Sequence, residues 1–347
     1  MQFTFHRIWR GIALVFTVSL VTSCVSSIPN AQKSTSTSAN PVAAANAPKV
    51  VATTTILCDM VREIAQNTVN LTCLLKPGVD GHVYQPVPED RRAIEDAKLI
   101  LYSGYDFEPG LIKFIQSTSN PAPKVAVAEK AVPKPLMGHE HGEKHGNEKA
   151  AEHNHDHVEG SDTPDPHVWQ NAENGAKMAE VIQAELTKLI PENKQLYIKN
   201  GEVLETQLNA IHRWIKSQIA TVPAANRKLV TTHDAMQYFS EAYNIPVEGA
   251  LQGLNTQEKP TATRVKELVD EVKAAGVPTI FAEVVVNSKL IEAVARDAKV
   301  KVADGEIYSD SLGEAGSEGD TYPKMLIANT RTIVEGLNGT YVAFQPK

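Results

Sequence analysis

Apolar residues between positions 49 and 190 occur alternately in short continuous runs and at helical spacing. The run 50–54 is typical of a buried strand, and Ile56, Met60 and Ile64 then recur on one face of a predicted helix that ends at Gln66. The same alternation continues downstream. It predicts strands at Val69–Leu75, Lys98–Tyr102 and Val125–Ala128, and helices at Glu89–Asp96, from Glu108 onward, and at Asn171–Leu189. Strands that alternate with helices indicate a parallel sheet.

A longer helical pattern runs from Pro191 to about Thr221. Its apolar residues recur at spacings of mostly three and four: Tyr197, Leu204, Leu208, Ile211, Ile215 and Ile219. A continuous helix of this length would be about 45 Å long. That length suits a rigid connection between two lobes better than a surface helix of one lobe. His212 lies off the apolar stripe, so we expect it to be exposed to solvent.

The alternation of strands and helices begins again after this helix. It predicts strands at Lys228–Thr232, Val247–Leu251, Thr279–Ala282 and near Val300–Ala303, and helices at Ala235–Tyr243, Thr261–Ala275, Ser288–Ala298 and Tyr322–Leu337. The predicted fold class is therefore α/β. Two parallel-sheet lobes with helices packed around each, residues 49–190 and 222–347, are joined by one long rigid helix, residues 191–221.

The N-terminus has the features of a secretory signal. Arg7 and Arg10 precede the apolar run Ile12–Val21, which is too short to span a bilayer. The run ends in Val-Thr-Ser-Cys, which matches a bacterial lipobox and predicts a signal peptide over residues 1–23 and a lipid on Cys24. An ordinary signal peptidase site nearby is the alternative. Residues 24–48 are rich in Ser, Thr, Ala, Asn and Pro and predict a flexible tether that spans about 25–30 Å. Either way, the mature protein is expected to work outside the cytoplasm.

The composition is that of a soluble globular protein, with 42% hydrophobic and 22% charged residues. The net charge of −7 and the lack of a basic patch with interleaved aromatic residues argue against nucleic acid as a partner. Besides Cys24, the chain has Cys58 and Cys73. A disulfide between them would contribute about 3 kcal/mol in the chain-entropy model. Two buried, reduced thiols are the alternative. The pair lacks the CxxC spacing of a structural zinc site.

Histidines and acidic residues are concentrated between Gly138 and Gly160. The histidines of this tract are His139, His141, His145, His153, His155 and His157. The tract has no apolar periodicity, so we expect a mobile loop that gathers metal ions at auxiliary weak sites. An accidental polar insertion or a tag-like tract is the alternative.

Four further residues fall where a cleft between two lobes would lie. His82 is in the loop after the second strand, His167 follows a stiff Asp-Pro turn, His233 ends a strand, and Asp310 is in a loop after a strand. Ligands of open α/β sheets bind beyond the carboxyl ends of the strands. Three imidazoles and one carboxylate suit tetrahedral zinc, and a set of four protein ligands leaves no position for a catalytic water. Glu283 is a possible second-shell carboxylate. Each histidine taken alone would also fit a hydrogen-bonded loop or helix-cap residue.

Five segments in order carry a resemblance to a known family: Val51–Ile56, Pro77–Pro86, Asp165–Trp169, Thr232–Phe239 and Ile307–Leu312. They look like the zinc- and manganese-binding lipoproteins that serve ABC transporters as substrate-binding proteins, and the resemblance covers Lys49–Lys347. It implies two lobes joined by a rigid helix, with the metal between them. His82 and His167 would then be the ligands from the first lobe, and His233 and Asp310 those from the second. It also implies a membrane permease and a cytoplasmic ATPase as partners.

The resemblance bears on the choice of metal as well. Manganese-type members carry a glutamate where His233 stands, and an added imidazole favours zinc. The histidine-rich loop is likewise a trait of zinc-type members. Both features predict Zn²⁺ bound at one tight site by a monomeric protein. Two departures stand out: Gly81, where the family more often has proline and which would loosen its loop, and the Cys58/Cys73 pair.

Three other functions fit parts of the sequence. A manganese- or iron-binding member of the same family would share the fold. A zinc hydrolase is disfavoured because the sequence has no H-E-x-x-H helix and Asp310 would take the place of the catalytic water. An adhesin or an extracytoplasmic metal store would also use the tether and the histidine-rich loop.

Overall fold

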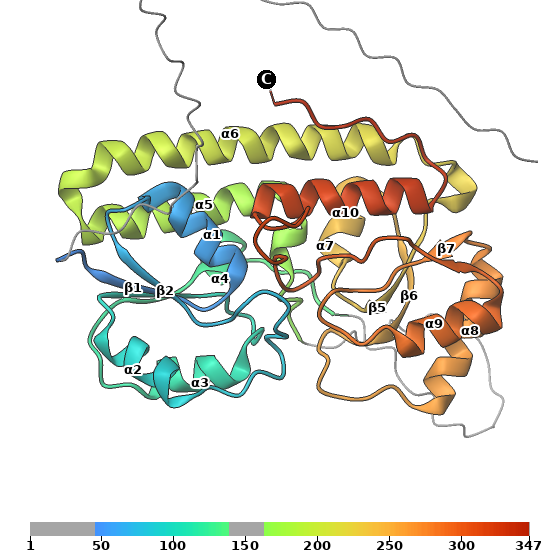
Figure 1. Ribbon diagram of the computed structural model, residues 1–347, viewed down its shortest axis with the longest axis horizontal. Coiled ribbons are helices and arrows are strands. Elements are labelled where there is room, and N and C mark those ends of the chain that lie inside the picture. The colour runs from blue at the N-terminus through green and yellow to red at the C-terminus, as the bar shows by residue number, and fades with distance from the viewer. Residues whose placement is uncertain (1–45, 139–162, 347) are drawn as a thin grey trace, which may run out of the picture. The chain divides into compact units, whose positions relative to one another are not determined.

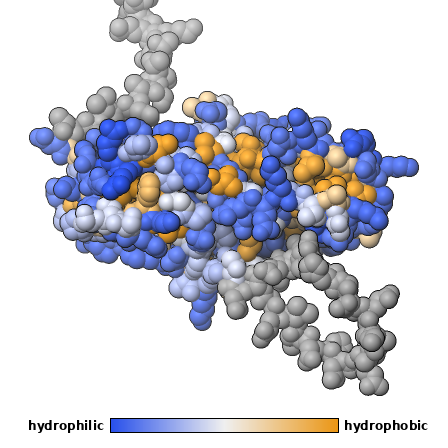
Figure 2. All heavy atoms as spheres, turned by 90° about the horizontal axis from the view of Figure 1, so that it is seen from below, coloured by the Kyte–Doolittle hydropathy of each residue, from blue (hydrophilic) through white to orange (hydrophobic). Residues whose placement is uncertain are grey.

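The computed structural model describes residues 46–138 and 163–346, which belong to one compact unit, Pro41–Lys347. The signal peptide, Cys24, most of the tether and the six histidines of the tract 139–157 lie outside the described residues. Among the described residues, no helix has the length and apolar character needed to span a bilayer. On the face seen in Figure 2, hydrophobic residues form separate patches within a largely hydrophilic surface.

The N-terminal half is built on a parallel four-stranded sheet in the order β2-β1-β3-β4 (Figure 1). The strands are β1 Lys49–Ala52, β2 Asn70–Cys73, β3 Leu99–Tyr102 and β4 Lys124–Ala126. The helices between and after them are α1 Thr55–Ala65, α2 Pro88–Asp96, α3 Pro109–Ser117 and α4 Val127–Ala131. The strand predicted at Val125–Ala128 is shorter than expected. Helix α4, which no sequence pattern predicted, begins directly after it.

Helix α1 illustrates why this part of the chain folds as it does. Thr54 caps its N-terminus by accepting a hydrogen bond from Leu57 N, and the apolar face with Ile56, Met60 and Ile64 is buried. One turn into the helix, Cys58 forms a disulfide with Cys73 at the end of β2, with the two Cα atoms 5.9 Å apart. The structure thus has the disulfide rather than the pair of reduced thiols.

Two long helices follow, α5 Ala172–Leu189 and α6 Lys194–Ile219, after a 3-10 turn at Val168–Gln170. A second 3-10 turn, Pro191–Asn193, replaces the predicted first turn of the long helix, so α6 has 26 residues and is about 39 Å long. Helix α6 packs lengthwise against α5 and α10 (Tyr322–Gly336) and also against α1 (Figure 1). It is therefore part of a helical layer that both halves share.

The expectation of a solvent-exposed His212 was wrong. Its side chain is buried: the ring centroid lies 5.3 Å from that of Tyr243 in α7 (Gln237–Tyr243), and Nε2 lies 3.5 Å from a carboxylate oxygen of Glu173. Helix α7 covers this side of α6, and no pattern within α6 itself indicates that covering.

The C-terminal half contains two parallel strand pairs, β5-β6 and β7-β8. A hydrogen bond from Phe281 N to Val230 O, 2.9 Å, joins the end of β7 to β5. The strands are β5 Leu229–His233, β6 Val247–Gln252, β7 Thr279–Ile280 and β8 Lys301–Val302. The helices are α7 Gln237–Tyr243, α8 Ala262–Ala275, α9 Lys289–Ala298 and α10 Tyr322–Gly336, and Ala224–Asn226 forms a 3-10 turn. The predicted α/β class with parallel sheets and one long helix is confirmed, whereas the lobe boundaries remain a prediction.

Candidate metal centre

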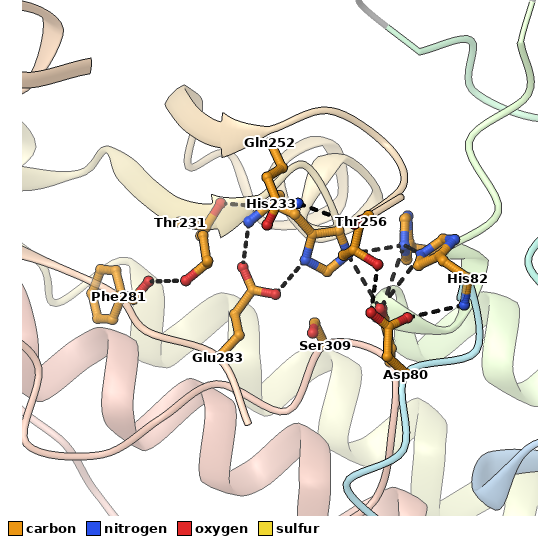
Figure 3. A network of polar contacts seen from close by, with 12 residues as sticks. Asp80, His82, Thr231, His233, Gln252, Thr256, Phe281, Glu283 and Ser309 are labelled. Atoms are coloured by element: carbon orange, nitrogen blue, oxygen red, sulfur yellow. Dashed lines mark hydrogen bonds and ion pairs between the residues drawn. The ribbon is translucent and has the colours of Figure 1, made fainter. Parts of the chain in front are cut away.

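The four candidate ligands come from four separate loops and strand ends and meet in the interior. His82 lies in the loop between β2 and α2, and His167 immediately precedes the 3-10 turn at Val168. His233 is the last residue of β5, and Asp310 lies in the loop between β8 and α10. All four side chains are buried. In Figure 3, His82 and His233 approach one another from opposite sides, with Glu283 behind His233.

The distances between the donor atoms match a tetrahedral site. His167 Nε2 lies 3.3 Å from His82 Nε2 and 3.4 Å from His233 Nε2. Carboxylate oxygens of Asp310 lie 3.5, 3.4 and 3.3 Å from Nε2 of His82, His167 and His233. One ligand atom from each of the four residues lies within 4.8 Å of all the others. A tetrahedron with metal–ligand distances of about 2.0–2.1 Å has edges of about 3.3–3.4 Å.

Asp310 provides the clearest sign that a cation fits here. Its side chain is fully buried, and neither carboxylate oxygen has a hydrogen-bond partner among the described residues. A buried carboxylate without hydrogen bonds is costly unless a cation compensates it. Imidazole nitrogens of three histidines lie 3.3–3.5 Å from its oxygens, beyond ordinary hydrogen-bond length. The donor set therefore fits a divalent metal ion between the oxygens and the nitrogens.

The charges around the site raise one histidine pKa and lower another. Burial lowers the pKa of His82, and the nearby carboxylate of Asp310 offsets only part of that effect. Burial also acts to lower the pKa of His233, but Glu283 and Asp310 outweigh it and hold the pKa well above the ordinary value. For Asp310, burial acts to raise the pKa, but the imidazoles, His233 foremost, hold it well below its usual range. A proton on His233 thus balances carboxylate charge until a cation replaces it.

Two buried carboxylates orient two of the rings. Asp165 Oδ1 lies 2.8 Å from His167 Nδ1 and accepts a hydrogen bond from His167 N at 2.9 Å. Glu283 Oε2 contacts His233 Nδ1, and Glu283 Oε1 accepts from His233 N at 2.8 Å. Because an ionised carboxylate only accepts, each Nδ1 carries a proton, and in the neutral ring Nε2 presents its lone pair to the centre. The expected position of Glu283 behind a ligand agrees with this geometry. The role of Asp165 was not foreseen.

His82 is held differently. Its backbone N–H donates to Asp80 Oδ1 at 2.9 Å, and its ring packs edge-on against Phe107 at a centroid distance of 4.8 Å. An aspartate two residues before the histidine therefore caps the backbone of both His82 and His167. This Asp-x-His pattern is the sequence signal that could have revealed Asp165. At Gly81 a Cβ atom would lie 2.7 Å from the Phe107 ring, so this ring leaves no room for a larger residue.

Comparison with known proteins also indicates a metal-binding protein. A model of the family "zinc-uptake complex component A, periplasmic" matches residues 50–336. The chain belongs to this family. Membership of the zinc-uptake component A family makes it an extracytoplasmic substrate-binding protein of a metal ABC transporter and not an enzyme. The resemblance seen in the sequence is thereby confirmed.

Two curated relatives of this zinc-uptake component A chain are named for manganese. The manganese-binding lipoprotein MntA of Halalkalibacterium halodurans is 31% identical over 291 residues, which cover 84% of this chain and 88% of the relative. The lipoprotein PsaA of Streptococcus pneumoniae serotype 4, from a manganese ABC transporter, is 32% identical over 295 residues, covering 83% and 89%. Among solved structures, the periplasmic zinc-binding protein TroA from Treponema pallidum is 30% identical with a TM-score of 0.74, covering 84% and 99%.

Proposed function

We propose that the protein captures Zn²⁺ outside the cytoplasm and delivers it to the membrane permease of an ABC importer. The observation that carries the proposal is the donor set: three buried imidazole nitrogens and one buried carboxylate that has no hydrogen bonds among the described residues, with all four ligand atoms within 4.8 Å of one another. The residues proposed as ligands are His82, His167, His233 and Asp310. A nitrogen-rich, four-coordinate site favours zinc over manganese, which prefers more oxygen ligands and higher coordination.

Manganese is the competing cargo, because two of the relatives are named for it. One experiment distinguishes between the two metals. Protein purified with chelator is titrated with Zn²⁺ and with Mn²⁺, and each is then used to displace the other. Zinc should bind at one tight site and should not be displaced by a large excess of manganese. Displacement of zinc by equimolar manganese would overturn the choice of metal.

The ligand assignment is tested by His233→Ala. The substitution removes one of four donors and leaves Glu283 with only the backbone N–H of residue 233, so the tight calorimetric transition for zinc should disappear. His212→Ala is the matched control, because His212 is also a buried histidine but contacts Tyr243 and Glu173 rather than the centre. Tight zinc binding retained in His233→Ala would refute the assignment.

The proposal extends to parts of the sequence that lie outside the described residues. A lipid on Cys24 and the tether to residue 48 would hold the protein at a membrane surface. The histidines between 139 and 157 would supply weak, exchanging sites beside the tight one. Deletion of residues 139–157 should lower the zinc stoichiometry and leave one tight site. Complete loss of tight binding would place that site in the tract instead.

A further inference from the structure

Asp310 follows the C-terminal sheets along the chain, yet its loop is hydrogen-bonded to N-terminal segments. On one side, Trp169 Nε1 and Gln170 Nε2 donate to the carbonyl oxygen of Ser309 at 2.8 and 2.7 Å. Trp169 and Gln170 belong to the turn that begins next to His167. The backbone immediately before Asp310 is therefore attached to the segment that carries another ligand.

The other side of Asp310 is attached in the same way. Leu312 N donates to Thr55 Oγ1 at 2.9 Å, and Gly78 N donates to Ser311 Oγ at 3.0 Å. Thr55 begins α1, and Gly78 lies in the loop that carries His82. Asp310 is thus held from both sides by the elements that present His82 and His167.

The apolar packing forms two cores that share the C-terminal strands. The larger core combines α1, α5, α6 and α10 and includes Ile307 and Leu312, which flank the Asp310 segment, together with Leu229 in β5 and Phe281 after β7. A separate, smaller core lies among the C-terminal strands and α8 and α9. Its buried members are Val230, Leu251, Leu268, Val269, Val272, Val277, Ile280, Ala282, Ile291, Val294, Ala295 and Ala298. Ile307 N donates to Ala282 O at 2.8 Å, whereas Tyr308 N donates to Asn329 in α10, so the chain leaves the smaller core at this point.

His233 takes its position from the C-terminal strands, which together with α8 and α9 form a small C-terminal body. It ends β5, which packs against the larger core through Leu229 and against the smaller core through Val230, and it pairs with Gln252 at the end of β6. Its ring and its backbone N–H are both held by Glu283, which follows Ala282. One ligand is therefore oriented by the small C-terminal body, whereas the Asp310 loop is attached by hydrogen bonds to the segments that present the other two ligands.

The loop after β6 connects this small body to the loop of His82. Gln252 Nε2 donates to the carbonyl oxygens of Thr256 and Glu258, which shapes the loop after β6. From it, Thr256 Oγ1 donates to Asp80 Oδ2, and Gln257 Nε2 donates to His82 O at 3.2 Å. Figure 3 shows Thr256 beside Asp80, next to the histidines. Neither Thr256 nor Gln257 belongs to the proposed ligand set.

We propose that the ion is released by separation of His233 from His82, His167 and Asp310, and that Thr256 and Gln257 are positioning residues that latch the site shut. This rests on the proposed function, because it assigns the ion to these four ligands. By position along the chain, His82 and His167 would form one group of ligands and His233 and Asp310 the other. The contacts instead group Asp310 with His82 and His167, because the Asp310 loop is attached to N-terminal segments on both sides.

The latch is tested by the double variant Thr256→Val, Gln257→Ala. Stopped-flow mixing of the zinc-loaded protein with excess chelator should show zinc dissociation about tenfold faster than in the wild type, because two hydrogen bonds across the cleft are lost. The d–d spectrum of the cobalt(II)-loaded variant should keep its tetrahedral form, because the ligands are unchanged. Glu258→Ala, an exposed position in the same loop, is the control and should dissociate at the wild-type rate. An unchanged rate in the double variant, or a changed cobalt spectrum, would overturn the latch.

The division of the ligands is tested by two distances between spin labels. Labels on Arg91→Cys in α2 and Arg296→Cys in α9 report a distance between the small C-terminal body and the rest of the molecule. Labels on Arg91→Cys and Glu318→Cys both lie outside the small C-terminal body. Cys24 is replaced by alanine in all samples, and reducing agent is omitted so that the Cys58–Cys73 disulfide stays intact. Removal of zinc should shift the 91–296 distance and leave the 91–318 distance unchanged. A shift of both distances, or of neither, would refute the division.

Failure of the proposed function gives a different result from failure of this inference. If the wild-type protein in the same experiments shows no tight zinc site, the proposed function fails. If zinc binds tightly through the four residues but the double variant and the label pairs behave otherwise than stated, only the release scheme fails.

Discussion

The carboxylates behind the two oriented histidines should differ in how far their charge can be removed without loss of metal binding. Asp165 accepts both hydrogen bonds of His167, from Nδ1 and from the backbone N–H, on the single oxygen Oδ1. Glu283 uses a different oxygen for each of the two donors of His233. An amide has only one oxygen. Asp165→Asn therefore keeps both hydrogen bonds, whereas Glu283→Gln must turn its NH₂ group toward one of the donors.

The magnitude follows from this count. Loss of an outer carboxylate typically costs about 10- to 100-fold in metal affinity. For Asp165→Asn we expect the lower end, about tenfold or about 1.4 kcal/mol, since both hydrogen bonds to His167 are kept, although the charge is lost and the NH₂ group takes the buried place of Oδ2. For Glu283→Gln we expect about 100-fold or about 2.7 kcal/mol. An amide NH₂ facing Nδ1 of His233 favours the tautomer with the proton on Nε2, and that tautomer has no lone pair for the metal.

The assay is competition for zinc with a chromophoric chelator of known affinity, at one pH and ionic strength. Glu173→Gln is the control, because its carboxylate faces His212 outside the site, and its zinc affinity should equal that of the wild type. Thermal unfolding of each metal-free variant verifies that the fold is intact. Equal losses for the two variants, or a larger loss for Asp165→Asn, would refute the reasoning from hydrogen-bond count.

Three further results are expected. Burial raises the pKa of Glu108 to about 7 from the ordinary 4.5, so the free energy of unfolding should fall by about 3 kcal/mol as pH rises through this window. In urea unfolding without metal, the stability of Glu108→Gln relative to the wild type should rise by about that amount between pH 4 and pH 8. A difference that does not depend on pH would contradict this. Because the pKa of His233 is raised, zinc binding near pH 7 should release about one proton, and zinc affinity should fall as pH decreases. Calorimetry in buffers of different ionisation enthalpy measures the number of protons released, and a release of zero protons would contradict the prediction. Cys73→Ser opens a disulfide loop with a sequence separation of 15 and should cost about 3 kcal/mol of unfolding free energy, with reducing agent affecting only the wild type.

The sequence by itself determined the class of fold and the kind of chemistry. Strand runs such as 50–54 and the helical spacing of Ile56, Met60 and Ile64 are local patterns, and each element buries the face that its own sequence makes apolar. The loop positions of His82, His167, His233 and Asp310 could be predicted for the same reason, because the carboxyl ends of parallel strands share one edge. The Asp-x-His turns at positions 80–82 and 165–167 are equally local, although Asp165 was overlooked.

Only the tertiary structure decided how these pieces meet. His212 appeared exposed from its position on α6, and it is buried because α7 packs over it from a separate part of the chain. The pairing of Glu283 with His233 depends on how β7 lies beside β5, across a separation of 50 residues. The contacts of the Asp310 loop with Trp169 and Thr55 span larger separations still. The spacing of apolar residues predicts which face of an element is buried. It does not predict which distant element covers that face, because that contact is made only once the whole chain has folded.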